Sequence, residues 1–317
     1  QNLLKFNSYQ NSQARLTIYL CYLAHKLGIP YQDDIEIPFD FSRRRLSVIV
    51  SDKNNKIQMI TKGAVEEILN ICTLVDYKGE VSTITKDIKE NIKEISKNLN
   101  KDGLRVIAIC QKNDIQKSSF DISDEKNMVL LGFIGFLDPP KESAKEAIES
   151  LNNAGIRVMV LTGDNVEVTR CVCNKAGINS KKIITGNKID TLSDVALSRL
   201  LKRNNIFAKL SPIQKARIVR VLKQNGNVVG YMGDGINDSP ALTNSDVGIS
   251  VDTAVDIAKE TADIILLEKD LNVLLDGVME RKKNICKFNE IYKNGNKLQL
   301  WGSSFSNYCK HCITIFT

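Results

Sequence analysis

A run of carboxylate and amide side chains follows an apolar segment near residue 230. Asn227–Tyr231 is apolar enough to form a buried parallel strand, and Met232–Leu242 (MGDGINDSPAL) continues from it. Two glycines flank Asp234, so the backbone can turn sharply there and approach a ligand closely. With Asn237 and Asp238, this residue would gather hard oxygen ligands at a strand's carboxyl end, where open α/β sheets bind ligands. Such donors suit Mg²⁺, and Mg²⁺ suits phosphate; the alternative is an ordinary Asp/Gly/Asn turn.

Two further strand exits carry groups that suit a phosphate. Thr162, Gly163 and Asp164 end another apolar segment. The threonine hydroxyl and the glycine backbone N–H are both good donors to a phosphate oxygen, although Thr-Gly-Asp alone is common at strand exits. Lys215 would lie in the first turn of a helix that follows a third strand, because a serine cap and a proline precede it. We interpret it as a charge partner for phosphate, and the alternative is a solvated lysine.

The composition is that of a globular protein with room for two domains. The chain has 317 residues, 43% of them hydrophobic and 26% charged, enough for two sizeable cores. The net charge of +7 comes mainly from dispersed lysines, with one tight cluster at Arg43–Arg45, which argues against nucleic-acid binding. The cysteines lack metal-ligand spacing in the main body, so reduced thiols in a cytosolic compartment are expected. No apolar run approaches the ~20 residues that cross a bilayer.

The hydrophobic pattern divides the chain into two parts with different rhythms. The first part indicates a mixed α+β domain, with expected strands at 45–50, 56–61 and 104–110 and expected helices at 64–72 and 84–99. From Leu130, strands and helices alternate regularly, which is typical of a doubly wound parallel sheet. Its expected strands are 132–137, 157–161, 206–210, 228–232, 247–251 and 264–267, and its expected helices include 142–153, 166–176, 192–202 and 212–224. Asp138-Pro139-Pro140 is a rigid joint, because consecutive prolines fix φ.

The phosphate-type turn, the lysine and the carboxylate turn follow one another in the order of the haloacid-dehalogenase-type phosphotransferases. From about residue 35 to 283 the chain resembles a narrower group, the P-type ATPases, and within them the magnesium-transporting bacterial subgroup. The motifs that carry this resemblance are IPFDFSRRRLSVIV (37–50), TKGAVEEIL (61–69), GLRVIA (103–108), GFLDPPKE (135–142), LTGD (161–164), residues 207–215, MGDGINDSPAL (232–242) and residues 247–268. The resemblance implies an α/β fold. A mixed α+β nucleotide-binding domain (1–130) would join a doubly wound, haloacid-dehalogenase-like parallel-sheet domain (131–283).

The resemblance also implies a role for residues of the first domain. Phe41 resembles the aromatic residue that stacks on adenine; its alternative role is core packing. Lys62 and Gly63 match the Lys-Gly-Ala motif that lines the ATP pocket. Arg105 matches an arginine that reaches the nucleotide phosphates.

In the second domain, the implied roles concern the phosphoryl group. Thr162 and Gly163 resemble the turn that holds it, with Asp164 in support. Lys215 resembles the lysine that neutralises an aspartyl phosphate. Asp234 resembles the Mg²⁺ ligand, with Asn237 and Asp238 in the surrounding network.

A P-type ATPase accepts phosphate on the aspartate of an Asp-Lys-Thr-Gly-Thr string, and these 317 residues do not contain that string. We therefore expect the chain to begin after it, and the parallel sheet to lack its first strand. The resemblance implies a fragment of a magnesium-importing pump, on the cytoplasmic face of the inner membrane, that binds ATP and Mg²⁺. Its partners would be the pump's actuator and transmembrane domains. The alternatives are a non-catalytic nucleotide-binding module and a soluble dehalogenase-type phosphatase, which would need its own aspartate nucleophile before residue 130.

The tail of the chain departs from the family pattern after about residue 283. A membrane helix should begin there, but residues 284–317 are polar. We interpret this tail as the product of a shifted reading frame and expect it to be poorly ordered. On that interpretation, Cys309 and Cys312 are together by accident and form no metal site.

Overall fold

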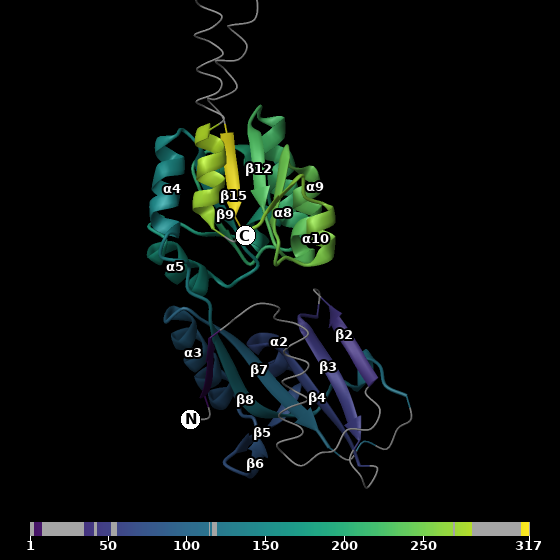
Figure 1. Cartoon of the computed structure of the whole chain (residues 1–317). Coiled ribbons are helices and arrows are strands. Elements are labelled where there is room, and N and C mark those ends of the chain that lie inside the picture. Colours follow the sequence, from purple (N-terminus) through teal and green to yellow (C-terminus); the bar gives the residue numbers. More distant parts are fainter. Residues whose placement is uncertain are drawn as a thin grey trace, which may run out of the picture. The chain divides into compact units, whose positions relative to one another are not determined.

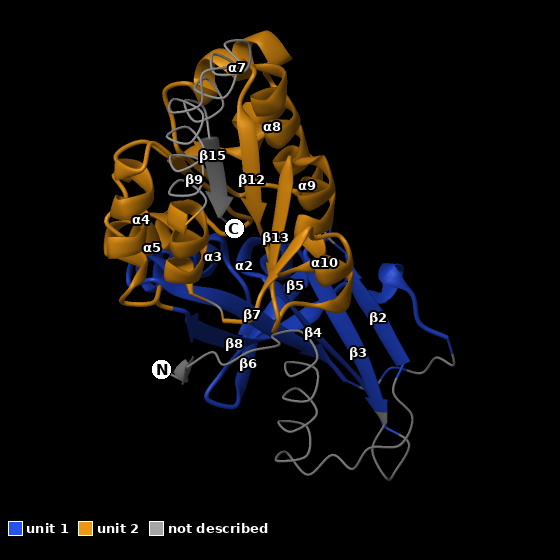
Figure 2. Cartoon of the chain, turned by 45° about the horizontal axis from the view of Figure 1, so that its top comes forward, with its two compact units in different colours: residues 1–138 blue, residues 139–317 orange. Residues whose placement is uncertain are grey.

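The computed structural model of the chain describes residues 3–7, 35–40, 43–51, 56–113, 115, 119–268, 270–280 and 312–316. Two compact units divide it, residues 1–138 and residues 139–317 (Figure 2). The division falls between Asp138 and Pro139, within the proline joint that the sequence indicates. Each unit has its own sheet, so each is described separately.

Unit 1 is built on one mostly antiparallel sheet. Its strands are β1 (Leu3–Asn7), β2 (Ile35–Asp40), β3 (Arg45–Ser51), β4 (Ile57–Ala64), β5 (Cys72–Tyr77), β6 (Glu80–Thr83), β7 (Leu104–Lys112) and β8 (Met128–Leu137). They lie in the order β2-β3-β4-β7-β8-β5-β6, and β1 also pairs with β8. The β1–β8 and β5–β8 pairs are parallel.

The two faces of this sheet are different. One face packs against the helices α2 (Val65–Ile71) and α3 (Lys86–Lys101), and its buried core includes Met59, Ile68 and Met128. The other face carries a smaller apolar cluster that includes Leu46 and Ile109. A short 3₁₀ helix, η1 (Ile122–Asp124), precedes β8. The unit is therefore a mixed α+β domain. Lys62 pairs with Leu46 and Ile109 and lies on the second face of its sheet.

Unit 2 is a parallel sheet between two layers of helices (Figure 1). Its strands are β9 (Arg157–Leu161), β10 (Ile184–Thr185), β11 (Ile206–Ala208), β12 (Val228–Met232), β13 (Val247–Val251), β14 (Ile264–Leu266) and β15 (Cys312–Phe316). Its helices are α4 (Ala144–Asn153), α5 (Val166–Lys175), α6 (Gly186–Asp190), α7 (Asp194–Leu201), α8 (Pro212–Gln224), η2 (Ile236–Asp238), α9 (Ser239–Asn244), α10 (Asp256–Glu260) and residues 271–280. The strand order is β10-β11-β9-β15-β12-β13-β14.

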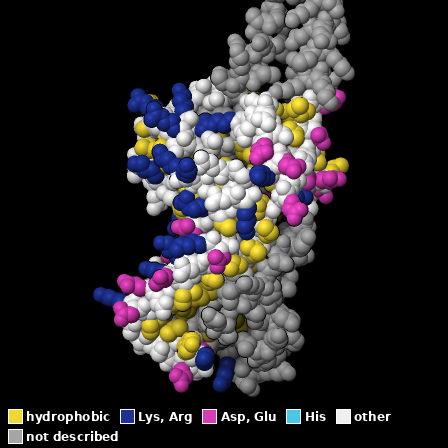
Figure 3. Space-filling model, turned by 90° about the vertical axis from the view of Figure 1, so that its left-hand side faces the viewer, with side chains coloured by type: hydrophobic (Ala, Val, Ile, Leu, Met, Phe, Trp, Pro, Cys, Tyr) yellow, Lys and Arg dark blue, Asp and Glu magenta, His cyan; other side chains and the backbone are white. Residues whose placement is uncertain are grey.

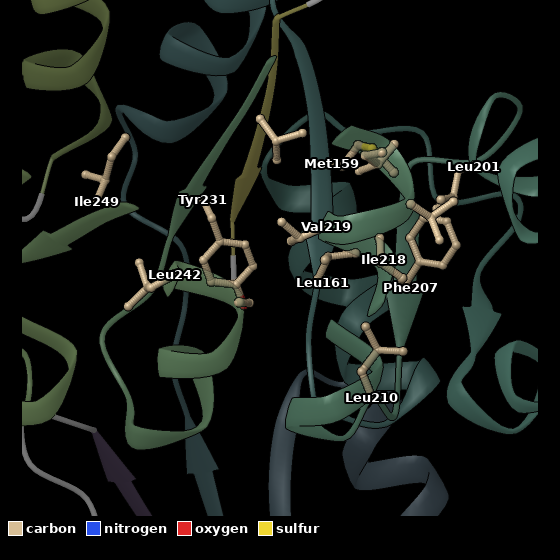
Figure 4. Close-up of a cluster of buried hydrophobic side chains, with 14 of the residues drawn as sticks. Met159, Leu161, Leu201, Phe207, Leu210, Ile218, Val219, Tyr231, Leu242 and Ile249 are labelled. Atoms are coloured by element: carbon tan, nitrogen blue, oxygen red, sulfur yellow. The ribbon is translucent and has the colours of Figure 1, made fainter. Parts of the chain in front are cut away.

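Alternating side chains of β9 supply both cores of unit 2. Val158 packs in a cluster with residues of α4 and residues 271–280. Met159 and Leu161 belong to the larger cluster on the other face, with Phe207, Tyr231 and residues of α7 and α8 (Figure 4). This period of two is what a strand buried on both faces requires. The doubly wound, parallel α/β class is therefore confirmed.

β15 fills the centre of this sheet although it comes from the far end of the chain. It pairs in parallel with β9 on one side and β12 on the other, so that Ile315 lies opposite both Met159 and Tyr231. The tail was expected to be poorly ordered, and the structure differs at these five residues. The reason is that the facing edges of two buried strands carry N–H and C=O groups that need partners. The sequence predicts that this sheet lacks one strand, and β15, from the C-terminal part of the chain, occupies its central position. Cys309 and the other tail residues before 312 lie outside the described residues.

The domain boundary also differs from the expected one. The sequence pattern places it after residue 130 and assigns residues 132–137 to the second domain. In the structure these residues belong to β8, which pairs with β7 on one edge and with β1 and β5 on the other. Sequence rhythm cannot distinguish such a strand from the first strand of a parallel sheet, because partners determine the sheet to which it belongs.

Two further features of the described residues concern the helices and the surface. In the part of the chain that the structure describes, no helix combines the length and the apolar character needed to cross a membrane. On the face seen in Figure 3, several Lys and Arg side chains gather at the upper left, and the acidic side chains lie mainly at the right and lower down.

Candidate functional site

The predicted phosphate residues lie at one edge of the unit 2 sheet. β9, β11 and β12 belong to the same parallel sheet, so their carboxyl ends meet at the same edge. Two backbone hydrogen bonds join the first two exits: Leu210 N donates to Thr162 O at 3.0 Å, and Lys209 N donates to Asp164 O at 2.8 Å. The Thr162–Asp164 turn is therefore fixed against the loop that leads into α8.

Lys215 is directed to the interior by the way α8 begins. Ser211 Oγ accepts from Gln214 N at 3.3 Å, and Gln214 Oε1 accepts from Ser211 N at 2.9 Å. This capping box begins the helix at Pro212 and places Lys215 in the first turn. The lysine side chain is 7% exposed, and its Nζ donates to Asp238 Oδ1 at 2.8 Å. It is not the solvated lysine of the alternative interpretation.

Asp238 is the centre of a buried polar network. Besides Lys215, the hydroxyl of Tyr231 donates to its Oδ1 at 3.0 Å, and Gly235 N donates to its Oδ2 at 3.2 Å. Burial and the Asp238 carboxylate raise the pKa of Tyr231 far above its usual value, so the phenol stays protonated. The structure therefore gives Asp238 the role of an internal anchor for Lys215.

The three predicted oxygen donors after β12 differ in exposure. Asp234 is exposed and Asn237 half-buried, whereas Asp238 is buried. Among the described residues, no group of three or more Asp, Glu, His or Cys side chains could hold a metal ion. Asp234 and Asn237 would suit Mg²⁺ that takes its other ligands from phosphate and water, which is how proteins commonly bind it.

Close packing explains the first glycine of this turn. A Cβ at Gly233 would lie 2.5 Å from Asp238 Cβ. Gly233 N donates to Ile249 O at 3.1 Å, and Ser250 Oγ donates to Gly233 O at 3.0 Å. Two hydrogen bonds to β13 thus hold the turn that follows β12, and glycine permits the close approach of Asp238.

The Thr162–Asp164 turn is closed by a hydrogen bond between the side chain of its first residue and the backbone of its third. Asp164 N donates to Thr162 Oγ1 at 3.1 Å, and the threonine hydroxyl keeps its own hydrogen for another acceptor. Asn165 Oδ1 then accepts from Val168 N at 2.9 Å and caps α5. Gly163 is exposed, so its backbone lies at the surface of the sheet edge.

In unit 1, Lys62 lies in β4 between two apolar neighbours. It pairs with Leu46 of β3 and Ile109 of β7, and it is 7% exposed. Burial lowers the pKa of Lys62 to about 8, although the Glu36 carboxylate acts to raise it. A Cβ on the next residue, Gly63, would lie 2.6 Å from Arg44 O, so the backbone of the β2–β3 turn packs directly on this position.

Arg105 shares a face of the sheet with Lys62. Ile109 lies opposite Lys62, and Arg105 is four residues from Ile109 on the same strand, β7. Side chains two and four residues apart on a strand point to the same face. Arg105 is exposed. The predicted adenine-binding residue, Phe41, lies outside the described residues.

The sequence did not single out Glu125, a buried carboxylate of unit 1 with several hydrogen-bond donors around it. It is 3% exposed and accepts hydrogen bonds from Arg43, Arg45 and Ser47. These three partners are 78 to 82 positions from Glu125 in the chain. The Arg43–Arg45 cluster was a visible signal, but nothing local to it identifies its acidic partner.

Comparison with known proteins shows the family. A family model described as P-type ATPase, cytoplasmic domain N, matches residues 20–143. The chain is 44% identical to "Magnesium-transporting ATPase, P-type 1" of Escherichia coli (strain K12) over 287 residues, which is 89% of the chain. The chain belongs to the P-type ATPase family.

Other relatives match over similar lengths. The protein of the same name from Salmonella typhimurium (strain 14028s) is 45% identical over 89% of the chain. "Calcium-transporting ATPase 1" of Bacillus cereus (strain ATCC 10987) is 32% identical over 81% of it. The chain spans about one third of the length of these three relatives, 32%, 31% and 30% respectively.

Proposed function

We propose that this chain is the ATP-binding and phosphoryl-handling part of a magnesium-transporting P-type ATPase, on the cytoplasmic side of the membrane. The observation that carries the proposal is the buried Lys215–Asp238 pair at the same sheet edge as the Thr162 turn and Asp234. The identity of 44% to a magnesium-transporting relative supports the choice of ion.

At the edge of the unit 2 sheet, charge and hydrogen bonding would be aimed at one phosphoryl group. Thr162 and Gly163 would donate to its oxygens, and Lys215 would oppose its negative charge. Asp238 would hold the lysine in place. Asp234 and Asn237 would hold Mg²⁺, which supplies further charge neutralisation when bound. Positioning and charge neutralisation account for most of the catalysis of phosphoryl transfer.

On unit 1, the face that carries Lys62 and Arg105 would bind the nucleotide. Phe41 would stack on the adenine ring, and the two cations would attract the phosphates. The shared face of Lys62 and Arg105 supports this arrangement. The buried position of Lys62 makes its charge effective, because a partly desolvated cation interacts more strongly with an anion than a solvated one does.

The complete reaction would be ATP hydrolysis coupled to Mg²⁺ movement in the whole pump, with its actuator and transmembrane domains. Because the Asp-Lys-Thr-Gly-Thr string is not in these residues, we propose nucleotide binding without turnover for the chain by itself. Release of inorganic phosphate from a simple phosphate ester by the purified chain would favour the soluble phosphatase instead.

Titration with a fluorescent, non-hydrolysable ATP analogue tests the proposal. Phe41→Ala and Lys62→Ala should each weaken binding by about tenfold, the worth of one good contact near 1.4 kcal/mol. Lys101→Ala is the control, since this lysine is exposed at the end of α3 and should leave binding unchanged. Titration curves that are the same for all four proteins would remove the nucleotide assignment.

A further inference from the structure

We infer that Glu125 is a positioning residue for the nucleotide-binding face of unit 1, acting through the β2–β3 turn. The inference rests on the proposed function for its link to ATP. It concerns a residue that would not touch the nucleotide but would fix the backbone against which Lys62 and Gly63 pack.

The Glu125 carboxylate is surrounded by donors from a single segment. Arg43 Nη1 donates to both of its oxygens at 2.7 Å, Arg45 Nε donates to Oε2 at 2.5 Å, and Ser47 Oγ donates to Oε1 at 2.6 Å. Burial acts to raise the pKa of Glu125, but the hydrogen bonds from Ser47, Arg43 and Arg45 outweigh it and hold this pKa below its usual value. The carboxylate is therefore ionised and bound to both arginines at neutral pH.

The two arginines bracket the residue that contacts the Lys-Gly-Ala segment. Arg44 has a φ of 51°, a left-handed conformation that costs energy in a residue with a Cβ. Its carbonyl accepts from Ala64 N at 3.1 Å and would lie 2.6 Å from a Cβ at Gly63. Glu125 thus binds the residues on both sides of the strained Arg44 and holds the Arg44 carbonyl against Gly63 and Ala64.

A second chain of contacts leads from Glu125 to Lys62. Ser47 Oγ, which donates to the carboxylate, is also 2.7 Å from Thr61 Oγ1. Thr61 immediately precedes Lys62 in β4. On the outer side of the turn, Arg43 Nη2 donates to Pro38 O at 2.8 Å. The carboxylate therefore connects the end of β2, the start of β3 and the middle of β4.

Stability by itself does not explain such an arrangement. A buried ion pair is weak evidence for a gain in stability, since desolvation offsets much of its Coulomb energy, and its best-supported use is to fix one conformation. Here the conformation that is fixed is the turn adjoining Lys62 and Gly63. In the sequence, Phe41 comes between Asp40 and Arg43.

The test uses Glu125→Gln in the full chain, which keeps the shape of the side chain and removes its charge. Asp124→Asn is the matched control, because Asp124 is the neighbouring buried carboxylate and caps η1 through Asp121 N. We expect Glu125→Gln to weaken binding of the ATP analogue by about tenfold, and Asp124→Asn to leave it within twofold. Ser47→Ala, which removes one of the hydrogen bonds, should give a smaller loss and serves as the substitute if Glu125→Gln does not fold.

A double variant separates positioning from general stabilisation. If Glu125 acts through the turn, Glu125→Gln should cost much less affinity in a Phe41→Ala background than in the wild-type chain. Equal losses in both backgrounds, or a loss no greater than that of Asp124→Asn, would overturn the inference.

Amide hydrogen exchange keeps this test independent of the nucleotide assignment. The N–H of Ala64 bonds to Arg44 O, and that of Arg44 bonds to Asp40 O at 2.6 Å. Both should exchange at least tenfold faster in Glu125→Gln than in Asp124→Asn. Unchanged exchange at these two amides refutes the positioning role, whereas unchanged ATP-analogue binding in Phe41→Ala and Lys62→Ala refutes the proposed function.

Discussion

Replacing Lys215 with methionine removes the cation of a buried ion pair and keeps most of the apolar side chain. The lysine and aspartate side chains are 7% and 6% exposed, and Nζ lies 2.8 Å from Asp238 Oδ1. Loss of one partner from such a pair costs about 3–5 kcal/mol, because the other charge stays buried without compensation. The Tyr231 hydroxyl and Gly235 N–H still donate to Asp238, so we expect the lower end, about 3 kcal/mol.

Lys223→Met on the same helix is the matched control. Lys223 Nζ lies 3.1 Å from Asp246 Oδ1, but both side chains are 35% exposed, and pairs in contact with water contribute about 0–1 kcal/mol. The free energy of unfolding of unit 2 is measured from urea titrations followed by amide exchange in β12. A cost for Lys215→Met that is no larger than the cost for Lys223→Met would refute the argument that burial makes this pair important.

Three other substitutions or conditions test the rest of the structure. Gly233→Ala should destabilise unit 2 by about 1–3 kcal/mol, because its Cβ would lie 2.5 Å from Asp238 Cβ, whereas Gly235→Ala meets its nearest atom at 3.6 Å and should be tolerated; equal melting temperatures would contradict this. Thr314→Pro removes an N–H from the centre of the sheet, so amides of its partners Val158 and Gly230 should exchange faster; unchanged protection would remove β15 from the sheet. Lys62 has a pKa of about 8 in the folded chain against an ordinary 10.5. Between these values the unfolded chain binds more protons, so unit 1 should become more stable as pH rises through that range. Affinity for the ATP analogue should fall over the same range as Lys62 loses its charge, and Lys62→Met should make both profiles flatter; wild-type profiles that do not differ from those of the variant would refute the pKa argument.

The local signals in the sequence were sufficient for much of the second unit. The serine cap, the proline and the apolar spacing fixed α8, and β12 and β13 also have their expected bounds, 228–232 and 247–251. Each depends on residues within a few positions of one another, and such short-range preferences survive in any arrangement of the sheet. The α/β class and the strand exits that carry Thr162, Lys215 and Asp234 follow from the same signals.

Tertiary structure decided which of these groups meet. Lys215 and Asp238 are 23 residues apart, and Arg43 and Glu125 are 82 apart. Pairing with β7 makes β8 part of the first sheet. β15 pairs with the facing edges of β9 and β12. Local periodicity says that a strand or helix exists, but its neighbours depend on long-range packing and on satisfying every buried backbone group at once. For that reason the sequence by itself identifies the hydrogen-bond donors and the cations, and only the tertiary structure determines which residues they pair with.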